Sequence, residues 1–132
     1  MRARHLIVVL AAGVAAAAVL ALAAPASGGG GDREVRVRGT CTGSATSKLK
    51  LKEEDGRIEV EFEVDQNVNG RRWRVTLKRN GVRVFRGIRT TQPPSGSFEV
   101  RRVVRDGQGR ETITARARAL RGGQLCTARA RW

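Results

Sequence analysis

Few residue types in this chain could carry out chemistry, and the most suggestive group lies in the run 65–70, DQNVNG. Its oxygen-bearing side chains alternate and a glycine follows them, as in the first half of a calcium-binding loop. The glutamate that such a loop needs at its twelfth position is replaced by Thr76, and two arginines directly follow the glycine. We therefore interpret the run as a turn between two strands, in which Asn, Asp and Gly satisfy local backbone groups. A calcium site is kept as a minority hypothesis, with the ligands Asp65, Asn67 and Asn69.

Catalysis is restricted by the residues that are missing. The sequence has no tyrosine, and its one histidine, His5, lies in a segment that we expect to be removed on export. Without histidine, and with both cysteines in a disulfide, a Ser-His-Asp or Cys-His nucleophile cannot form, nor can a zinc site of His and Cys ligands. The acids Glu59, Glu61 and Glu63 share one strand face and could supply a glycosidase-like pair. A solvated face explains them better, and we expect it to be offset by basic residues of the following strand, Arg72, Arg74 and Lys78. We expect a protein that is not an enzyme and needs no cofactor.

Basic residues form the more distinctive feature, with 26 Lys and Arg against 12 Asp and Glu and a net charge of +14. The segment T-A-R-A-R occurs at 114–118 and again at 127–131. If these two strands pair through the turn between them, we expect arginine to face arginine. The predicted anion-binding residues are Arg116, Arg118, Arg129 and Arg131, joined by Arg36 and Arg38 if the first strand lies alongside. Codon bias in a GC-rich genome is the competing explanation, and composition alone does not separate the two.

The first 26 residues predict a signal peptide. A short positive start precedes an apolar run from Leu6 to Ala24, and the following A-P-A has the small residues that signal peptidase requires. We place cleavage after Ala26, with Ala24 as the second choice and an uncleaved membrane anchor as the alternative. Residues 27–32 are glycine-rich and read as a spacer. The domain is expected at 33–132, secreted or otherwise outside the cytoplasm.

A period of two dominates this domain, which predicts strands. We expect about eight of them, at 35–41, 48–52, 57–65, 72–78, 82–88, 98–104, 112–119 and 125–132. The dipeptides D-G at 55–56 and N-G at 80–81 predict tight hairpins. The run 90–97, TTQPPSGS, predicts a crossing from one sheet to another, because its prolines exclude a central strand. Lysines at 48, 50 and 52 suggest a sheet margin. The fold class is an antiparallel β-sandwich of immunoglobulin-like type, with a small closed barrel as the alternative.

The two cysteines, Cys41 and Cys126, lie near opposite ends of the domain. In an exported chain they are expected to form one disulfide. Cys126 shares its strand face with Ala128, Ala130 and Trp132, so both cysteines are expected on apolar sides of the terminal strands.

Several runs together resemble a known group of proteins; these are CTGSATSKLK, DGRIEVEFEVD, NGRRW, PSGSFEVRR and GGQLC. The set is similar to small exported proteins of high-GC Gram-positive bacteria that have no established activity. The resemblance covers nearly the whole mature chain. It implies a secreted all-β domain with one disulfide, and it transfers no functional residue.

The sequence thus predicts a secreted, non-enzymatic module. Its first expected partner is an anionic polymer of the cell envelope, bound by the arginine-rich face. The alternative is a protein-interaction or structural domain of the envelope that uses loops such as 90–97. Nucleic acid is disfavoured, because Trp73, Phe62 and Phe98 fall on apolar strand faces and supply no stacking platform, while the face of Phe85 is left open.

Overall fold

The computed structural model describes residues 33–132, and the predicted signal peptide and spacer lie outside them. No helix in this described part is long and apolar enough to cross a membrane. The strands are β1 (Glu34–Arg38), β2 (Thr40–Cys41), β3 (Thr46–Glu54), β4 (Arg57–Asp65), β5 (Arg72–Arg79), β6 (Val82–Thr90), β7 (Ser97–Arg105), β8 (Thr112–Ala119) and β9 (Leu125–Arg131).

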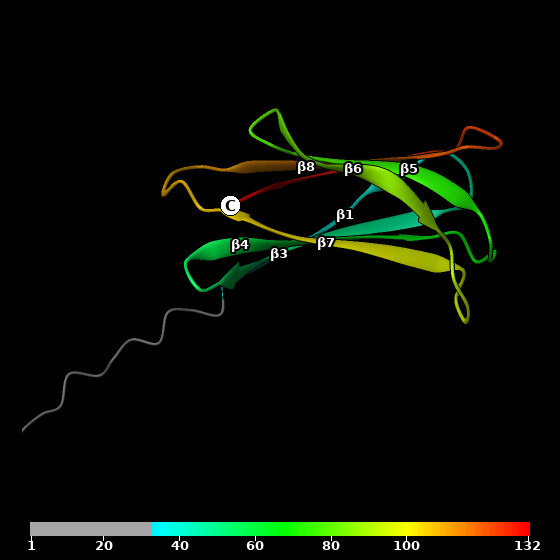
Figure 1. Cartoon of the computed structure of the whole chain (residues 1–132), viewed down its shortest axis with the longest axis horizontal. Helices are drawn as coiled ribbons and strands as arrows, with labels where there is room; N and C mark the ends of the chain where they lie inside the picture. The colour runs from blue at the N-terminus through cyan, green and yellow to red at the C-terminus, as the bar shows by residue number, and fades with distance from the viewer. Residues whose placement is uncertain (1–32) are drawn as a thin grey trace, which may run out of the picture.

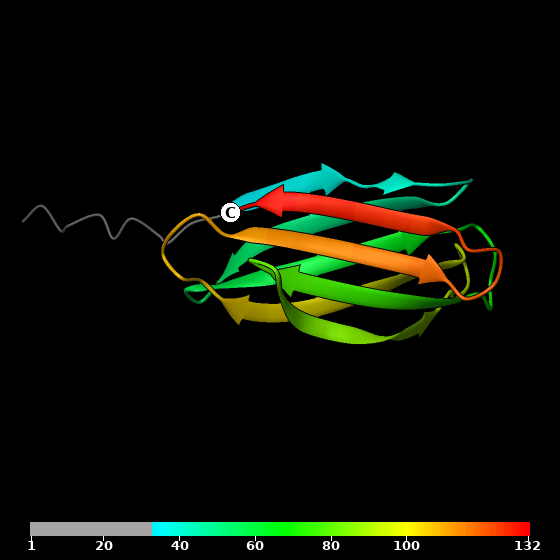
Figure 2. The ribbon, with the colours of Figure 1, turned by 90° about the horizontal axis from the view of Figure 1, so that it is seen from above.

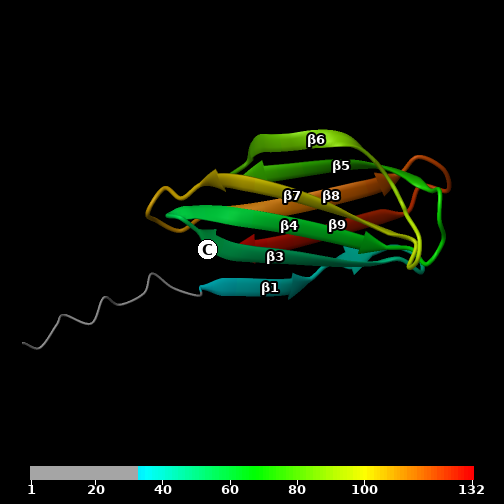
Figure 3. The ribbon, with the colours of Figure 1, turned by 60° about the horizontal axis from the view of Figure 1, so that its bottom comes forward.

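These strands form two antiparallel sheets that pack face to face (Figure 1). The four-stranded sheet has the order β1-β3-β4-β7, which Figure 3 shows from its outer side. The five-stranded sheet has the order β2-β9-β8-β5-β6, seen from above in Figure 2. The predicted antiparallel sandwich is therefore confirmed, and the alternative of a closed barrel is wrong.

The alternation read from the sequence produces the core directly. Side chains of a strand point to opposite faces in turn, so every second residue faces the other sheet. The core contains Leu49 and Phe62 from one sheet and Trp73 and Leu77 from the other, all with no exposed surface. Burying a side chain of this size stabilises the fold by roughly 1.5–3 kcal/mol. The residues between them are left on the two outer faces.

The two predicted hairpins are present. Asp55 and Gly56 both have positive φ, and so do Asn80 and Gly81. Two consecutive left-handed residues match the twist of antiparallel strands, and Asn, Asp and Gly adopt that conformation most easily. These turns join neighbouring strands of one sheet, β3 to β4 and β5 to β6.

Two of the connections that cross from one sheet to the other lie together at one end of the sandwich. Residues 91–96 lead from β6 to β7, so the crossing predicted from the proline-containing run is confirmed. Residues 66–71 lead from β4 to β5 in the same way. The expected sheet margin at 48–52 is wrong, because β1 pairs along the outer side of β3 and places that strand inside the sheet.

The first expected strand divides between the sheets at Gly39. β1 pairs with β3, whereas β2 pairs with β9 of the other sheet. A Cβ on Gly39 would lie 2.0 Å from the hydroxyl oxygen of Ser47 and 2.7 Å from the carbonyl oxygen of Thr127. Only glycine therefore lets the chain pass so closely between the two sheets.

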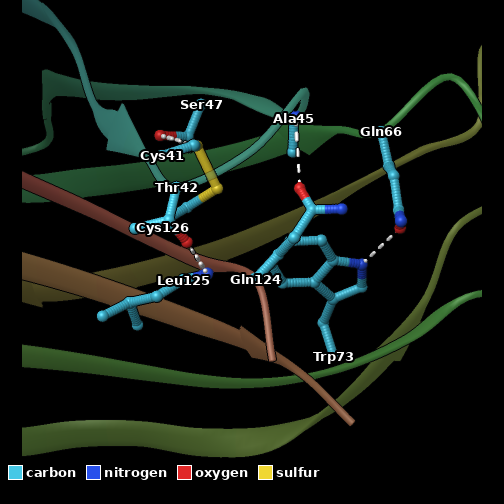
Figure 4. Close-up of a disulfide and its surroundings, with 9 residues drawn as sticks. All are labelled: Cys41, Thr42, Ala45, Ser47, Gln66, Trp73, Gln124, Leu125 and Cys126. Atoms are coloured by element: carbon cyan, nitrogen blue, oxygen red, sulfur yellow. Dashed lines mark hydrogen bonds between the residues drawn. A yellow bond between two sulfur atoms is a disulfide. The ribbon is translucent and has the colours of Figure 1, made fainter. Parts of the chain in front are cut away.

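The predicted disulfide between Cys41 and Cys126 is present (Figure 4). The two residues are directly paired on β2 and β9, so the bond joins neighbouring strands of one sheet. Cys126 is fully buried beside the apolar residues of β9, as its phase predicted. The bond holds the start of the domain to its last strand.

Candidate functional site

The outer face of the five-stranded sheet is the most unusual surface of the molecule. Apart from Leu125 at the start of β9, its outward positions on β5, β8 and β9 are occupied by arginine, lysine and threonine, while the inward positions are apolar and buried. Figure 2 looks onto this face. The strict alternation of T-A-R-A-R puts its small alanines in the core and its long cations in water.

A shallow groove of about 1020 Å³ runs across this face from β1 to β6. We call it the cationic groove. Four threonines line it, together with four small or apolar residues. Its basic lining residues are Arg38, Arg74, Lys78, Arg83, Arg86, Arg116, Arg118 and Arg129. Among residues 33–132, no carboxylate lines it, and none of these eight cations forms an ion pair.

The pairing of β8 with β9 staggers the arginines. Arg116 lies opposite Thr127, and Arg129 lies opposite Thr114. The expectation that arginine faces arginine across this ladder is wrong, because the antiparallel register pairs each copy of T-A-R-A-R with the other out of phase. Like charges directly opposite each other destabilise a sheet, and this register keeps them on diagonals. Two direct pairs of like charges remain among the groove residues, Arg74 opposite Arg118 on β8 and Lys78 opposite Arg83 on β6.

The outer face of the four-stranded sheet is built differently, because several of its cations have acidic partners. Lys48 lies 3.3 Å from Glu63, Lys50 pairs with Glu61, and Arg101 pairs with Glu59. The first two are cross-strand neighbours on β3 and β4, and the third joins β4 to β7. Opposite charges placed in this way stabilise a sheet modestly.

The pKa of Glu59 shows the effect of these ion pairs on an acid of the four-stranded sheet. The hydrogen bond from Arg101 holds the pKa of Glu59 well below its ordinary value of about 4.5, against the opposing effect of burial. The pKa of Lys50 is raised by its hydrogen bond to Glu61. These groups are ionised and engaged with each other at neutral pH, so they are not poised for proton transfer.

The glutamates therefore do not have the partners that the sequence suggested. We expected Arg72, Arg74 and Lys78 of the following strand to offset them. That expectation is wrong, because the chain crosses to the other sheet between β4 and β5. Arg72, Arg74 and Lys78 thereby lie on the outer face of the five-stranded sheet, and among residues 33–132 none of the three forms an ion pair.

Of the predicted anion-binding residues, Arg116, Arg118 and Arg129 come together in the cationic groove. Arg131 is the next outward residue on β9 and is exposed on the same face, beyond the groove lining. Arg38 lies at the groove margin, where the first strand leaves one sheet for the other. Arg36 is not part of the groove, because β1 belongs to the four-stranded sheet and its guanidinium pairs there with Glu34.

The sequence reading missed half of the groove's cations, those on β5 and β6. The period-two pattern of β5 already placed Arg74 and Lys78 on an outward face. Arg83 is different, because β6 bulges opposite Leu77 and Lys78, and the bulge turns Arg83 outward while Phe85 faces the core. A bulge changes the phase of a strand, so simple alternation could not identify this residue.

The aromatic side chains of β5, β6 and β7 are buried and do not line the cationic groove. Trp73 and Phe98 pack against each other in the core, with ring centroids 6.2 Å apart. Phe85 is buried beneath two guanidinium groups, those of Arg89 and Arg102, whose carbons lie 4.9 Å and 4.6 Å from its ring centroid. The groove therefore offers charge and hydrogen bonds without a stacking surface for bases.

The loop that resembled a calcium site is a structural crossing. The carboxylate of Asp65 accepts the backbone N–H of Asn67 at 2.9 Å, and Asn67 has positive φ, as expected for a local turn. The side-chain oxygen of Gln66 accepts the indole N–H of Trp73 at 2.9 Å (Figure 4). No group of three or more His, Cys, Asp or Glu side chains that could hold a metal ion occurs within the described part of the chain.

Thr91 holds this loop to the second crossing. Its hydroxyl oxygen accepts the N–H of Arg71 at 2.9 Å and donates to the carbonyl of Val68 at 2.6 Å. A Cβ on Gly96, whose φ is +71°, would lie 2.3 Å from the backbone nitrogen of Val68. The connections 66–71 and 91–96 are thus packed against each other as one unit.

One buried carboxylate lies at the opposite end, at the start of β8. Glu111 has a side chain that is 4% exposed, and it accepts from Arg79 and from the N–H of Gly107, each at 2.7 Å. The amide of Asn80 also donates to it. The hydrogen bond from Arg79 lowers the pKa of Glu111. Every contact of this acid ties a turn or loop in place, which is a structural role.

Comparison of the chain with protein-family models, with curated proteins and with solved structures finds no match in any of the three.

Proposed function

We propose that this protein is a secreted, non-enzymatic module that binds anionic polymers of the cell envelope through its cationic groove. The observation that carries the proposal is the segregation of charge between the two sheets. The outer face of the four-stranded sheet pairs several of its cations with glutamates, while the groove on the other side is lined by eight cations and, among the described residues, by no carboxylate.

This segregation bears on the competing explanation of codon bias. A genome rich in GC raises the arginine content of both faces alike, because codon usage is independent of the sheet to which a residue belongs. The four-stranded sheet comes from the same chain and carries a balanced surface. An unpaired cationic face therefore calls for a cause of its own, and attraction of a polyanion is the physical effect that such a face produces.

The non-enzymatic part of the proposal is supported by the carboxylates. Glu59 and Glu61 are engaged in ion pairs, and Glu111 holds turns together. A general acid needs a pKa near the working pH, yet the pKa values of Glu59 and Glu111 are shifted downward.

Export and fold type belong to the same proposal. A disulfide is typical of oxidising compartments outside the cytoplasm, which supports the assignment of residues 1–26 as a signal peptide and the resemblance to exported bacterial proteins. Two antiparallel sheets with crossing connections support an immunoglobulin-like sandwich. The disulfide departs from that type, because it joins neighbouring strands of one sheet.

A second candidate function is a protein contact made by the loops. Two of the loops carry exposed apolar residues, Val68 at 43% and Leu120 at 42%. The connection that holds Val68 is rigidly packed against 91–96. Such preorganised loops suit an interface whose affinity depends little on salt.

Binding to heparin and to isolated cell-envelope polymer tests the main proposal. The triple substitution Arg116→Gln, Arg118→Gln and Arg129→Gln should lower the salt concentration of elution strongly. The matched control Lys48→Gln, Lys52→Gln and Arg57→Gln removes the same charge from the four-stranded sheet and should elute near the wild-type protein. Wild-type elution below about physiological ionic strength, where screening is already strong, would refute the groove as a binding site. Salt-independent capture of an envelope protein would favour the loops instead.

A further inference from the structure

The cationic groove carries a second kind of hydrogen-bond donor besides its cations. Thr76, Thr114 and Thr127 line it, on three adjacent strands. In the described part of the chain, the threonine hydroxyls that make hydrogen bonds within the protein are those of Thr42 and Thr91. The hydroxyls of Thr76, Thr114 and Thr127 have no protein partner there and are free to meet a ligand.

Each of these threonines is the direct cross-strand neighbour of an arginine. Thr114 pairs with Arg129, while Thr127 and Thr76 lie on either side of Arg116. The Cβ atoms of such neighbours are about 4.5–5.5 Å apart. A ligand group held by a guanidinium on one strand is therefore within reach of a hydroxyl on the next. This arrangement repeats across the face.

The repeated arginine–threonine pair favours one kind of anion. A guanidinium forms two parallel bonds in a plane, and a carboxylate can satisfy that fork with oxygens whose acceptor sites lie in the same plane. A phosphate group is tetrahedral, so it can accept the planar fork and still present acceptor sites outside that plane to a neighbouring hydroxyl. The pair of donors thus fits phosphate better than carboxylate.

The shape of the groove indicates that the phosphates belong to a linear polymer. The groove crosses five strands, a distance of about 20 Å at the usual strand spacing. Cations are present along its whole course, from Arg38 at one margin to Arg83 at the other. No aromatic ring lines it among residues 33–132, so bases and sugar rings gain no stacking contact.

We propose that the cationic groove binds a linear phosphate polymer laid across the strands, with each phosphate held between an arginine and the threonine of the next strand. This inference rests on the proposed function, because it names the class of polyanion that the same face takes. It adds the hydroxyls to the cations as determinants of affinity.

The test compares two soluble probes of matched length and charge, inorganic polyphosphate and poly-L-glutamate, by isothermal titration calorimetry on the purified protein. The variant Thr76→Val, Thr114→Val and Thr127→Val keeps the charge and the β-branched shape of the face while removing the hydroxyls. The wild-type protein should bind polyphosphate more tightly than polyglutamate. The variant should lose about tenfold or more in affinity for polyphosphate, as expected when charge-assisted hydrogen bonds are lost, and should bind polyglutamate unchanged. Thr46→Val, on the outer face of the four-stranded sheet, should behave like the wild type.

The outcomes separate this inference from the function on which it rests. If the valine variant binds polyphosphate as the wild type does, while Arg116→Gln, Arg118→Gln and Arg129→Gln lose it, the hydroxyls play no part and only the inference fails. If neither variant changes binding, the proposed function fails as well. Tighter binding of single-stranded DNA than of polyphosphate, or capture by phosphatidylglycerol vesicles without affinity for soluble polyphosphate, would also overturn the inference. An unchanged melting temperature of each variant shows that the sheet is intact.

Discussion

Arg116 of β8 lies directly opposite Thr127 of β9, and Arg129 lies opposite Thr114 in return. The two copies of T-A-R-A-R therefore complement each other, because the antiparallel register offsets them by one outward position. A short repeat in the sequence becomes a checkerboard of cations and hydroxyls on the sheet. This relationship spaces the like charges apart and defines the surface on which the proposed function depends.

Single arginine substitutions should change the salt dependence of polyanion binding. We expect Arg116→Gln to reduce the slope of log Kd against log salt concentration by about 0.7–0.9, since each lost phosphate contact releases fewer counterions. Titrations with polyphosphate at several salt concentrations measure the slope. Arg57→Gln, at the start of β4 on the other sheet, should leave it unchanged. Equal slopes for both variants would show that the polymer does not sit in the cationic groove.

Removal of the disulfide should destabilise the domain without affecting the groove. The bond links residues 85 positions apart, and the chain-entropy model gives about 4–5 kcal/mol for a loop of that length. We expect Cys41→Ala with Cys126→Ala to lower the free energy of unfolding in urea by an amount approaching this figure. Polyphosphate affinity should persist below the melting temperature, because Cys126 is buried on the core side of its strand. A loss of affinity in the folded variant would contradict this separation.

Glu111→Gln should destabilise the end of the sandwich where β8 begins. The neutral amide leaves Arg79 without its charged partner and weakens the bond from Gly107, for an expected cost of about 2 kcal/mol. Urea unfolding at pH 7 measures the loss. Glu99→Gln, an exposed substitution on β7, serves as the control and should change stability little.

The same acid predicts a pH dependence of stability. The pKa of Glu111 is lower in the folded protein than its ordinary value of 4.5, which applies to the unfolded chain. Its stabilising contribution is therefore fully present above about pH 4.5, and it is lost as the pH falls through the folded pKa. The wild-type protein should lose unfolding free energy on acidification below that pH, and Glu111→Gln should lose less. Identical acid sensitivity of the two proteins would contradict the assigned role of Glu111.

Gly96→Ala should disturb the packed crossings more than a comparable change elsewhere. Gly96 and Gly122 have nearly the same positive φ, +71° and +75°. Only at Gly96 would a Cβ collide with backbone, that of Val68, so Gly122→Ala isolates the conformational cost of about 1 kcal/mol. We expect Gly96→Ala to cost clearly more than this in urea unfolding. Equal costs would mean that the two loops do not press against each other.

Much of this fold could be read from the sequence, because a strand is a local structure. The strict alternation at 57–65 defines both the strand and its buried face, and Asp55-Gly56 defines the turn before it without reference to distant residues. The disulfide could also be predicted from the sequence, since an exported chain with two cysteines has only one possible pairing. These features depend on near neighbours or on a simple count.

The partners of each strand could not be read in this way. Whether Glu59 faces Arg74 or Arg101 depends on whether residues 66–71 turn back into the same sheet or cross to the other. Both routes satisfy the turn chemistry of Asn67 and Gly70. The crossing is decided by long-range contacts, such as the bonds of Thr91 to Arg71 and Val68.

The sequence by itself therefore determined that this is an all-β chain with one disulfide, and which side of most strands is apolar. The tertiary structure alone decided that basic residues of β5, β6, β8 and β9 share one face while the glutamates are neutralised on the other. The physical reason is that alternation acts within a strand, whereas register and sheet order arise from contacts between residues far apart in the chain.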